Sequence, residues 1–239
     1  MLSKNQVRFI NSLKRKKTRK TEGRFIAEGK KLVLDLLKSD FQVDKIYCEE
    51  DFDCPQQDRI QRVSARELGA VSSLTTPNSV LAVFKIPEVK PVLKKGLALA
   101  LDDINDPGNL GTIIRLCDWF DIPQILCSSN TVDCFNPKVV QSSMGSLARV
   151  QINYLDLAAY LSQEERSVYG TFMNGQSLYQ TEFKSDGILV MGNEANGISE
   201  EIRTHVDTEV GIPQFGDHKK AESLNVAMAT AIFLSEMRR

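Results

Sequence analysis

Residues 102–115 hold the side chains best suited to binding and chemistry in this chain. They link an apolar run, residues 97–101, to a segment whose apolar residues recur at helical spacing. The turn between them is rich in carboxylate, amide and glycine residues, and includes Asn109, with Arg115 shortly after. In open α/β sheets, ligands bind at the carboxyl ends of strands, where free N–H groups of the next helix favour anions. We therefore expect a binding site at this turn.

Two later segments also place polar side chains after apolar runs. In residues 187–199, an apolar strand leads into Glu194, which has a nearby glycine on each side. Such glycines permit a tight turn and the close approach of a ligand. The third segment begins with residues 211–213 and continues, after a loop, with residues 223–229, where Ser223 is expected to cap the last helix.

Together these three segments resemble the SpoU or TrmH-like branch of the SPOUT RNA methyltransferases. They occur in the order of that family, within residues 97–239, and residues 24–29 are more loosely similar to the small substrate-binding domain that many members carry. The resemblance implies methyl transfer from S-adenosylmethionine to the ribose 2′-hydroxyl of a nucleotide in structured RNA, either ribosomal or transfer RNA. It also implies a homodimer and a deep trefoil knot at the carboxyl end, an exception to the rule against threaded chains.

The apolar patterns predict an α/β protein with two domains. The first part of the chain is expected to form two helices and two short strands, at residues 4–16, 28–38, 43–47 and 80–86. Two prolines between residues 87 and 91 predict a stiff connector, so residues 1–90 form a basic RNA-binding domain and residues 91–239 the methyltransferase domain. In the second domain strands and helices alternate, which predicts a mainly parallel sheet with helices on both faces.

The resemblance assigns the catalytic roles to five residues: Asn109, Arg115, Glu194, Ser223 and Asn225. Asn109 is expected beside the reacting centre and Arg115 at the RNA phosphate or ribose. A guanidinium rarely gives up its proton, so Arg115 suits electrostatic stabilisation of the developing alkoxide better than base catalysis. The acceptor of the hydroxyl proton stays open between Arg115, Glu194 and water. Glu194 is equally suited to holding Asn109 or Arg115 in place.

A purely structural interpretation exists for each of these residues. Asn109 would cap a helix, and Arg115 would pair with Asp102 or Asp118. For S-adenosylmethionine the resemblance suggests main-chain and apolar contacts rather than a string of polar side chains, at Gly192, Ile212, Leu224, Asn174 and Gly175. Taken alone, Ile212 and Leu224 would be core residues.

Other nucleotide-binding classes have little support in the sequence. Ile198 stands where a phosphate-binding loop requires lysine, which disfavours a nucleotide triphosphatase. The chain has no Gly-x-Gly-x-x-Gly run, so a dinucleotide-dependent oxidoreductase is a weak alternative. A stronger one is an RNA-binding protein that keeps the fold without turnover.

Charge is distributed unevenly along the chain. The formal net charge is −1, yet the first 31 residues carry 11 basic and 2 acidic residues. Such a segment suits the neutralisation of RNA phosphates, although it would also suit an exposed helix end. The candidate RNA-binding residues are Lys14, Arg15, Lys16, Lys17, Arg19, Lys20 and Arg24.

The remaining features concern compartment and assembly. Five cysteines without a Cys-x-x-Cys pair predict free thiols and no metal site. The chain shows no apolar run of about 20 residues and no signal peptide, so we expect a cytoplasmic protein without membrane contact. The last helix is apolar nearly all round, which predicts that it is buried. Burial against a second subunit is what the resemblance to this dimeric family implies. Residues 215–222 form a longer loop than is usual in the family, in which we expect His218 to be a surface residue.

Overall fold

The structure, a computed structural model, describes residues 1–216 and 223–239 and divides into two compact units. Unit 1 consists of Met1–Val89 and Asp133–Arg149, and unit 2 consists of Lys90–Val132 and Val150–Arg239. The division after Val89 lies next to the boundary that the prolines indicated. The return of Asp133–Arg149 to unit 1 was not anticipated.

Unit 1 is a small α/β unit around a four-stranded sheet in the order β1-β4-β2-β3. Its strands and α-helices before Val89 are β1 (Arg24–Glu28), β2 (Val43–Cys48), β3 (Ile60–Arg62), β4 (Val80–Lys85), α1 (Lys4–Ser12), α2 (Lys16–Glu22), α3 (Lys30–Leu37) and α4 (Ala65–Val71). The prediction of one helix over residues 4–16 was wrong. The helix ends at Ser12, with the fully buried Leu13 as its C-cap, and Arg15 is extended before α2 begins.

Tilted and edge-to-face aromatic contacts attach the segment 133–149, which contains α6 (Pro137–Ser142), to the rest of unit 1. The ring of Phe135 lies 4.8 Å from that of Phe25 and 6.4 Å from that of Phe41, measured between centroids. Asp133 forms an ion pair with Arg19. Such contacts join residues about a hundred positions apart, which is why the local sequence pattern did not reveal them.

Unit 2 is built on a six-stranded sheet in the order β10-β8-β9-β5-β6-β7, whose neighbouring strands run parallel. The strands are β5 (Ala98–Leu101), β6 (Gln124–Ser128), β7 (Gln151–Leu155), β8 (Ser167–Ser177), β9 (Gly187–Met191) and β10 (Thr208–Gly211). The predicted parallel α/β architecture is confirmed.

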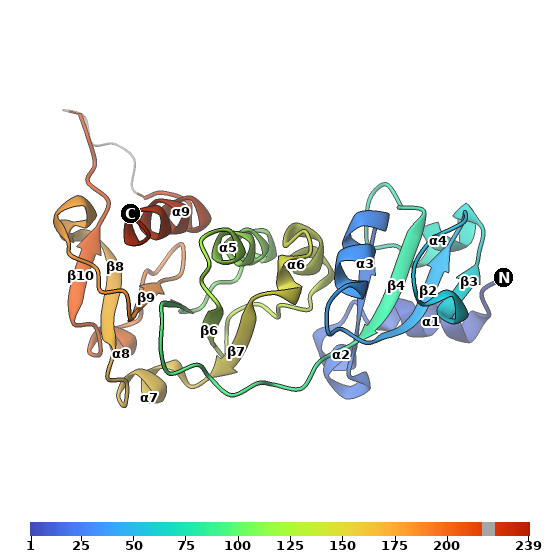
Figure 1. The fold of residues 1–239 in the computed structure, drawn as a ribbon, viewed down its shortest axis with the longest axis horizontal. Helices are drawn as coiled ribbons and strands as arrows, with labels where there is room; N and C mark the ends of the chain where they lie inside the picture. Colours follow the sequence, from blue (N-terminus) through green and yellow to red (C-terminus); the bar gives the residue numbers. More distant parts are fainter. Residues whose placement is uncertain (217–222) are drawn as a thin grey trace. The chain divides into compact units, whose positions relative to one another are not determined.

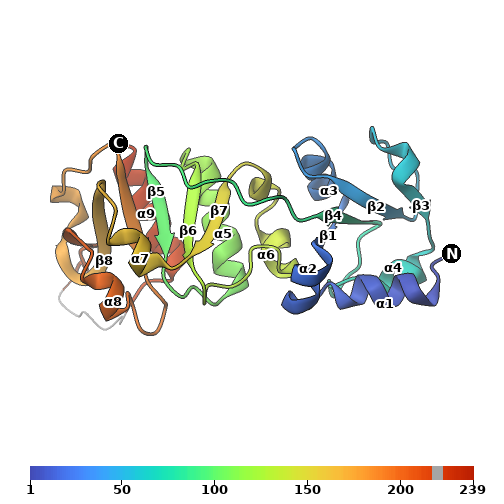
Figure 2. The ribbon, with the colours of Figure 1, turned by 90° about the horizontal axis from the view of Figure 1, so that it is seen from below.

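Helices cover both faces of this sheet, as predicted (Figures 1 and 2). One face packs against α7 (Leu157–Leu161) and α8 (Glu200–Arg203), through a core that includes Leu126, Ile188 and Ile202. On the other lie α5 (Pro107–Trp119) and α9 (Val226–Met237), which also contact each other. Among the described residues, no helix is both long and apolar enough to span a bilayer.

Strand register brings the first two predicted segments together. β5 pairs with β9 in parallel, with Leu101 opposite Met191, so the turns that follow the two strands are neighbours. α5 then begins at Pro107, and the side chain of Asp106 caps it by accepting from the N–H of Asn109 at 2.8 Å. Proline suits the first helical position because no N–H is needed there.

Candidate functional site

Three side chains from the three predicted segments form one hydrogen-bonded chain. The side-chain amide of Asn225 donates to Oδ1 of Asn109 at 3.0 Å, and the amide of Asn109 donates to Oε1 of Glu194 at 2.7 Å. The residues come from the start of α9, the first turn of α5 and the turn after β9. Their convergence in one place is what the resemblance implied.

The chemistry of the three groups sets the direction of this chain. A carboxylate only accepts hydrogen bonds, so Glu194 turns the NH₂ group of Asn109 toward itself. The Asn109 oxygen is then left to accept from Asn225. Each hydrogen bond is therefore donated in the direction of Glu194. The Asn109 amide is fixed in orientation because Asn225 binds its oxygen and Glu194 binds its NH₂ group.

Helix caps place two of these residues differently from the sequence-based interpretations. Asn225, not Ser223, is the N-cap of α9, because its Oδ1 accepts from the N–H groups of Ala227 and Met228. The prediction for Ser223 as cap was wrong; it lies two residues earlier and is exposed. Likewise, Asp106 rather than Asn109 caps α5, which leaves the Asn109 side chain for Glu194 and Asn225.

Arg115 takes no part in this hydrogen-bonded group. It is an exposed residue of α5, and within the described part of the chain its guanidinium forms no hydrogen bond or ion pair. The structural alternative of a pair with Asp102 is wrong, because the Asp102 carboxylate is buried and accepts from the N–H of Ser199 at 2.8 Å. The Arg115 guanidinium thus remains free to meet an external anion.

Three glycines in unit 2 allow main-chain segments to approach one another closely. A Cβ on Gly192 would lie 2.2 Å from the carbonyl carbon of Gly197. A Cβ on Gly175 would lie 2.6 Å from Val210, and one on Gly211 would lie 2.6 Å from the Phe172 oxygen. The approaches at Gly175 and Gly211 arise where the β8–β10 pairing jumps from Gly170 to Gln176, so that residues 171–175 leave the regular ladder. The approach at Gly192 lies in the turn after β9, which the Asn193–Gly197 bridge closes.

The predicted cofactor residues lie along these segments. Gly192 and Gly175 are at the close approaches, and Ile212 follows Gly211 directly. Leu224 precedes Asn225 and is 53 % exposed, so its interpretation as a core residue is wrong. Asn174 is also exposed. Main-chain groups beside the half-buried Ile212 and the exposed Leu224 suit the adenosine and methionine parts of S-adenosylmethionine, so the residues fit this cofactor.

Some of the predicted RNA-binding residues are exposed, and others form hydrogen bonds or ion pairs within the protein. Arg15, Lys16, Lys17 and Lys20 are exposed around α2. Lys14 donates to the carbonyl of Ser72, and Arg24 pairs with Asp44. For Arg19 the prediction was wrong.

The Arg19 side chain is only 2 % exposed, so it cannot contact RNA. Its guanidinium donates to Asp133 and to the carbonyls of Leu13 and Lys14. The guanidinium therefore lies in the bend between α1 and α2 and supplies donors to main-chain carbonyls that have no partner within a helix.

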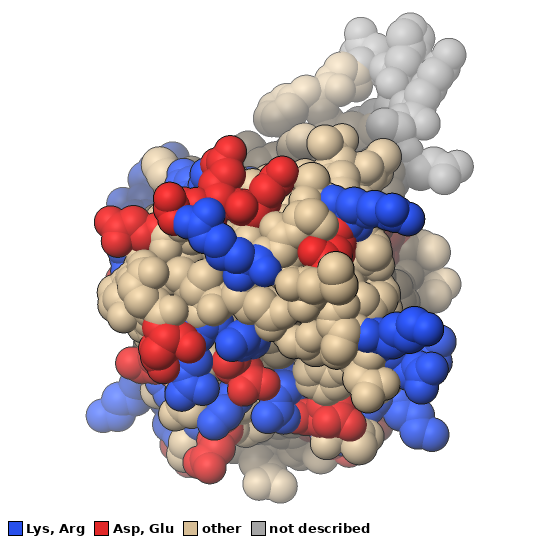
Figure 3. Space-filling view, turned by 90° about the vertical axis from the view of Figure 1, so that its right-hand side faces the viewer, with Lys and Arg blue, Asp and Glu red and all other residues tan. Residues whose placement is uncertain are grey.

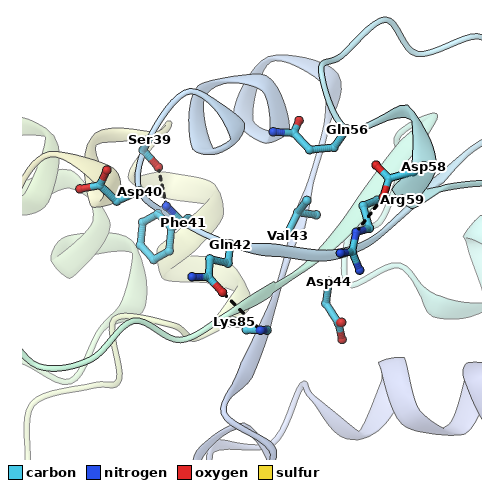
Figure 4. Close-up of a pocket in the computed structure, with 10 residues that line it drawn as sticks. All are labelled: Ser39, Asp40, Phe41, Gln42, Val43, Asp44, Gln56, Asp58, Arg59 and Lys85. Atoms are coloured by element: carbon cyan, nitrogen blue, oxygen red, sulfur yellow. Dashed lines mark hydrogen bonds and ion pairs between the residues drawn. The ribbon is translucent and has the colours of Figure 1, made fainter.

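Other surfaces of unit 1 are electrostatically mixed. The face drawn in Figure 3 shows basic and acidic side chains together, with an uncharged area among them. A hollow between the α3–β2 loop and residues 56–59 is lined by both signs of charge (Figure 4). Lys85 donates to Gln42 there, and Arg59 pairs with Asp58. None of the predicted catalytic residues lines this hollow.

The cysteines are part of the buried structure. None of the five forms a disulfide, and all five are buried. Burial raises the pKa of the Cys117 thiol on α5, and the nearby Asp118 raises it further. A protonated thiol is a poor nucleophile. The predicted long loop at residues 215–222, with His218, lies largely outside the described residues.

Comparison with protein families agrees with the geometry. The model of the SpoU rRNA methylase family matches residues 96–235, which include the whole Asn225–Asn109–Glu194 chain. The chain belongs to this family. The model of the MRM3-like substrate-binding domain matches residues 4–82, in agreement with the looser resemblance near the N-terminus.

Individual relatives match over nearly the full length. The chain is 33 % identical over 245 aligned residues to the 23S rRNA (guanosine(2553)-2′-O)-methyltransferase RlmP of Bacillus subtilis, covering 99 % of this chain and 97 % of that protein. A TrmH-family structure from Porphyromonas gingivalis superposes with a TM-score of 0.91 at 38 % identity, covering 100 % of this chain and 98 % of the other. An AdoMet-bound rRNA methyltransferase from Sinorhizobium meliloti superposes with a TM-score of 0.88 at 28 % identity, covering 100 % and 95 %.

Proposed function

We propose that this SpoU family member transfers a methyl group from S-adenosylmethionine to the ribose 2′-hydroxyl of a nucleotide in ribosomal RNA. The observation that carries the proposal is the hydrogen-bonded chain from Asn225 through Asn109 to Glu194. It gathers the polar groups of all three segments at the carboxyl ends of β5 and β9, where an α/β sheet binds its ligands.

The cofactor, when bound, would supply an electrophilic methyl group: the methyl–sulfur bond is exchanged for a bond to the ribose oxygen, S-adenosylhomocysteine leaves, and the hydroxyl proton passes to Glu194, Arg115 or water. Gly192, Ile212 and Leu224 would hold it, with Asn174 and Gly175 beside them. Asn109, fixed from both sides, positions the attacking hydroxyl, and Glu194 keeps Asn109 in orientation. Arg115 binds the RNA phosphate and stabilises negative charge that develops on the ribose oxygen. Ser223 and Asn225 complete the contacts to the ribose and the cofactor.

Ribosomal RNA is the favoured substrate over transfer RNA. The full-length relative from Bacillus subtilis is named for a guanosine of 23S rRNA, and a relative from Neisseria meningitidis, 31 % identical over 76 % of this chain, is also named for 23S rRNA. We therefore propose 23S rRNA as the first substrate to test. Five free thiols favour a reducing, cytoplasmic setting.

Unit 1 would supply most of the RNA affinity. Arg15, Lys16, Lys17 and Lys20 form an exposed cationic group that can neutralise phosphates without reading sequence. Residues 1–90 thus act as the substrate-binding domain and residues 91–239 as the methyltransferase domain, with the predicted knot in the latter.

We also propose a homodimer through the helical layer of α5 and α9. The expected burial of α9 on all sides is not met within one chain, since Met228 is 68 % exposed. On α5, Trp119 is 83 % exposed. Large apolar side chains at such exposure favour a protein partner, and a second copy fits the family. Sedimentation should give twice the chain mass, and Met228→Glu should shift it toward the monomer.

Mapping of ribose methylation tests the function directly. Ribosomal and transfer RNA from cells with and without the protein would be compared at each nucleotide. We expect one rRNA position to lose its methyl group and regain it on complementation with the wild-type gene but not with Asn109→Ala. A loss confined to tRNA would contradict the substrate class.

Calorimetric titration separates the enzyme from an RNA-binding protein that lacks turnover. We expect S-adenosylmethionine to bind the purified protein, and incubation with unmodified rRNA to yield 2′-O-methylated product. RNA binding without cofactor binding would support the non-catalytic alternative instead.

A further inference from the structure

Two hydrogen bonds join the turn after β5 to the turn after β9, and neither involves a predicted site residue. The side-chain amide of Asn193 donates to the main-chain carbonyl of Asp103 at 2.8 Å. The N–H of Ser199 donates to the Asp102 carboxylate at 2.8 Å. The first turn leads into Asn109 and the second contains Glu194. The two hydrogen bonds therefore help to set the distance between the Asn109 and Glu194 side chains.

Asn193 also shapes the turn that presents Glu194. Its Oδ1 accepts from the N–H groups of Ala195 and Asn196 at 2.9 and 3.1 Å. Its main chain exchanges two hydrogen bonds with Gly197, at 3.0 and 2.9 Å. The Asn193 side chain therefore closes the Glu194 turn with its oxygen, and its nitrogen attaches that turn to the carbonyl of Asp103.

The acceptor of this hydrogen bond, the Asp103 carbonyl, belongs to a residue with a left-handed main chain. Its φ of 57° lies in the left-handed region, which aspartate tolerates better than most residues. The N–H of Asp103 donates to Oγ of Ser128 at 2.9 Å. Thr131, fully buried, donates its hydroxyl to the Leu101 carbonyl and accepts from the N–H of Ile104. The loop after β6 thus holds the Asp103 carbonyl toward Asn193.

We propose that Asn193 is a positioning residue, which keeps Glu194 within hydrogen-bond distance of Asn109 by docking the Glu194 turn on the Asp103 carbonyl. This inference rests on the proposed methyl transfer. Loss of the dock would let the Glu194 turn drift while leaving the strands, the RNA-binding lysines and the main-chain cofactor contacts intact. Small displacements of positioning groups reduce turnover more than binding.

Asn193→Asp removes the donor to Asp103 and adds a negative charge, while the carboxylate can still accept from Ala195 and Asn196. We expect kcat to fall about tenfold or more, with the KM for RNA and the Kd for S-adenosylmethionine within about threefold of wild type. Asn193→Ser repeats the test without the added charge and serves if the first variant does not fold. Asn196→Ala, in the same turn, is the matched control and should retain wild-type kcat.

Asp103 provides the conservative comparison. Asp103→Gly keeps the carbonyl and accepts a positive φ, so it should retain more kcat than Asp103→Ala, in which the main chain is strained. The reverse order would contradict the role of the carbonyl.

A spectroscopic readout decides the inference independently of activity. In ¹⁵N spectra we expect the Asn109 side-chain NH₂ signal to shift and to exchange faster in Asn193→Asp or Asn193→Ser. Folded variants with unchanged kcat and an unchanged Asn109 signal would overturn the positioning role. So would equal losses in kcat, cofactor binding and thermal stability. A wild-type protein that methylates no RNA would instead refute the proposed function, and the NMR comparison would still decide the role of Asn193.

Discussion

The side chain of Asn109 donates to Glu194 at 2.7 Å across 85 residues of sequence. This contact bears on the two roles that the sequence left open for Glu194, which were orienting a neighbour and accepting the hydroxyl proton. An orienting role requires only an acceptor atom at this distance, whereas proton transfer requires a carboxylate. A substitution can therefore separate the two roles.

Glu194→Gln should retain kcat within about tenfold of wild type, whereas Glu194→Ala should lose about a hundredfold or more. Glutamine still offers a carbonyl oxygen to the Asn109 amide, and alanine offers none. Single-turnover methylation of rRNA at several pH values measures both variants. A loss in Glu194→Gln as deep as that in Glu194→Ala, with an altered pH profile, would assign the proton transfer to Glu194.

Arg115→Ala should lower kcat by about two to three orders of magnitude while leaving much of the S-adenosylmethionine affinity, because we propose that its exposed guanidinium binds the RNA rather than the cofactor. Arg115→Lys should restore part of the rate, since lysine keeps the charge without the bidentate geometry. Thr112→Ala, at an exposed position of the same helix, is the control. Near-normal turnover in Arg115→Ala would rule out the role.

Arg19→Met should destabilise unit 1 by about 3–5 kcal/mol, because it removes the cationic partner of the Asp133 carboxylate and the donors to the carbonyls of Leu13 and Lys14. Urea denaturation followed by far-UV circular dichroism measures the loss. Folded Arg19→Met should bind RNA like wild type. Unchanged stability together with weakened RNA binding would instead show that Arg19 contacts RNA.

Replacement of Lys16, Lys17 and Lys20 by alanine should weaken RNA binding without changing the unfolding midpoint. The slope of log Kd against log salt concentration should decrease by about 0.7–0.9 for each RNA phosphate that the variant no longer neutralises. Lys38→Ala, an exposed lysine at the end of α3, is the control for net charge. A slope equal to that of wild type would place the RNA elsewhere on the protein.

Acid should destabilise unit 2 through Glu164, whose side chain is 4 % exposed beside Arg166. Burial works to raise the pKa of Glu164, but hydrogen bonds from Arg166 and Tyr160 outweigh it and lower the pKa from 4.5 to about 2. The stabilisation is therefore complete above pH 4.5 and is lost as the pH falls toward 2.

The slope should reach at most about 1.4 kcal/mol per pH unit for this one group. Urea denaturation across this pH range measures it, with Glu164→Gln as the comparison. The difference in free energy of unfolding between wild type and variant should shrink as the pH falls. A difference independent of pH would show that Glu164 contributes through contacts other than its charge.

Much of unit 2 could be predicted from local sequence. The apolar run of β5 and the Asp106-Pro107 start of α5 depend on neighbouring residues only, and so does the alternation that gives a parallel sheet. The resemblance added the meeting of Asn109, Glu194 and Asn225. No local pattern could add it, because the hydrogen bonds join residues 85 and 116 positions apart.

What only the tertiary structure decided depends on partners distant in the chain. Arg19 and Lys20 look alike in a basic run, yet Arg19 is buried against Asp133 and Lys20 is exposed. Asn225 rather than Ser223 caps α9, because the cap is decided by where the main chain enters the helix. Likewise the hydrogen bond from Asn193 to the Asp103 carbonyl depends on strand order, which places the ends of β5 and β9 side by side. Sequence alone determined which groups were available, and packing determined which of them meet.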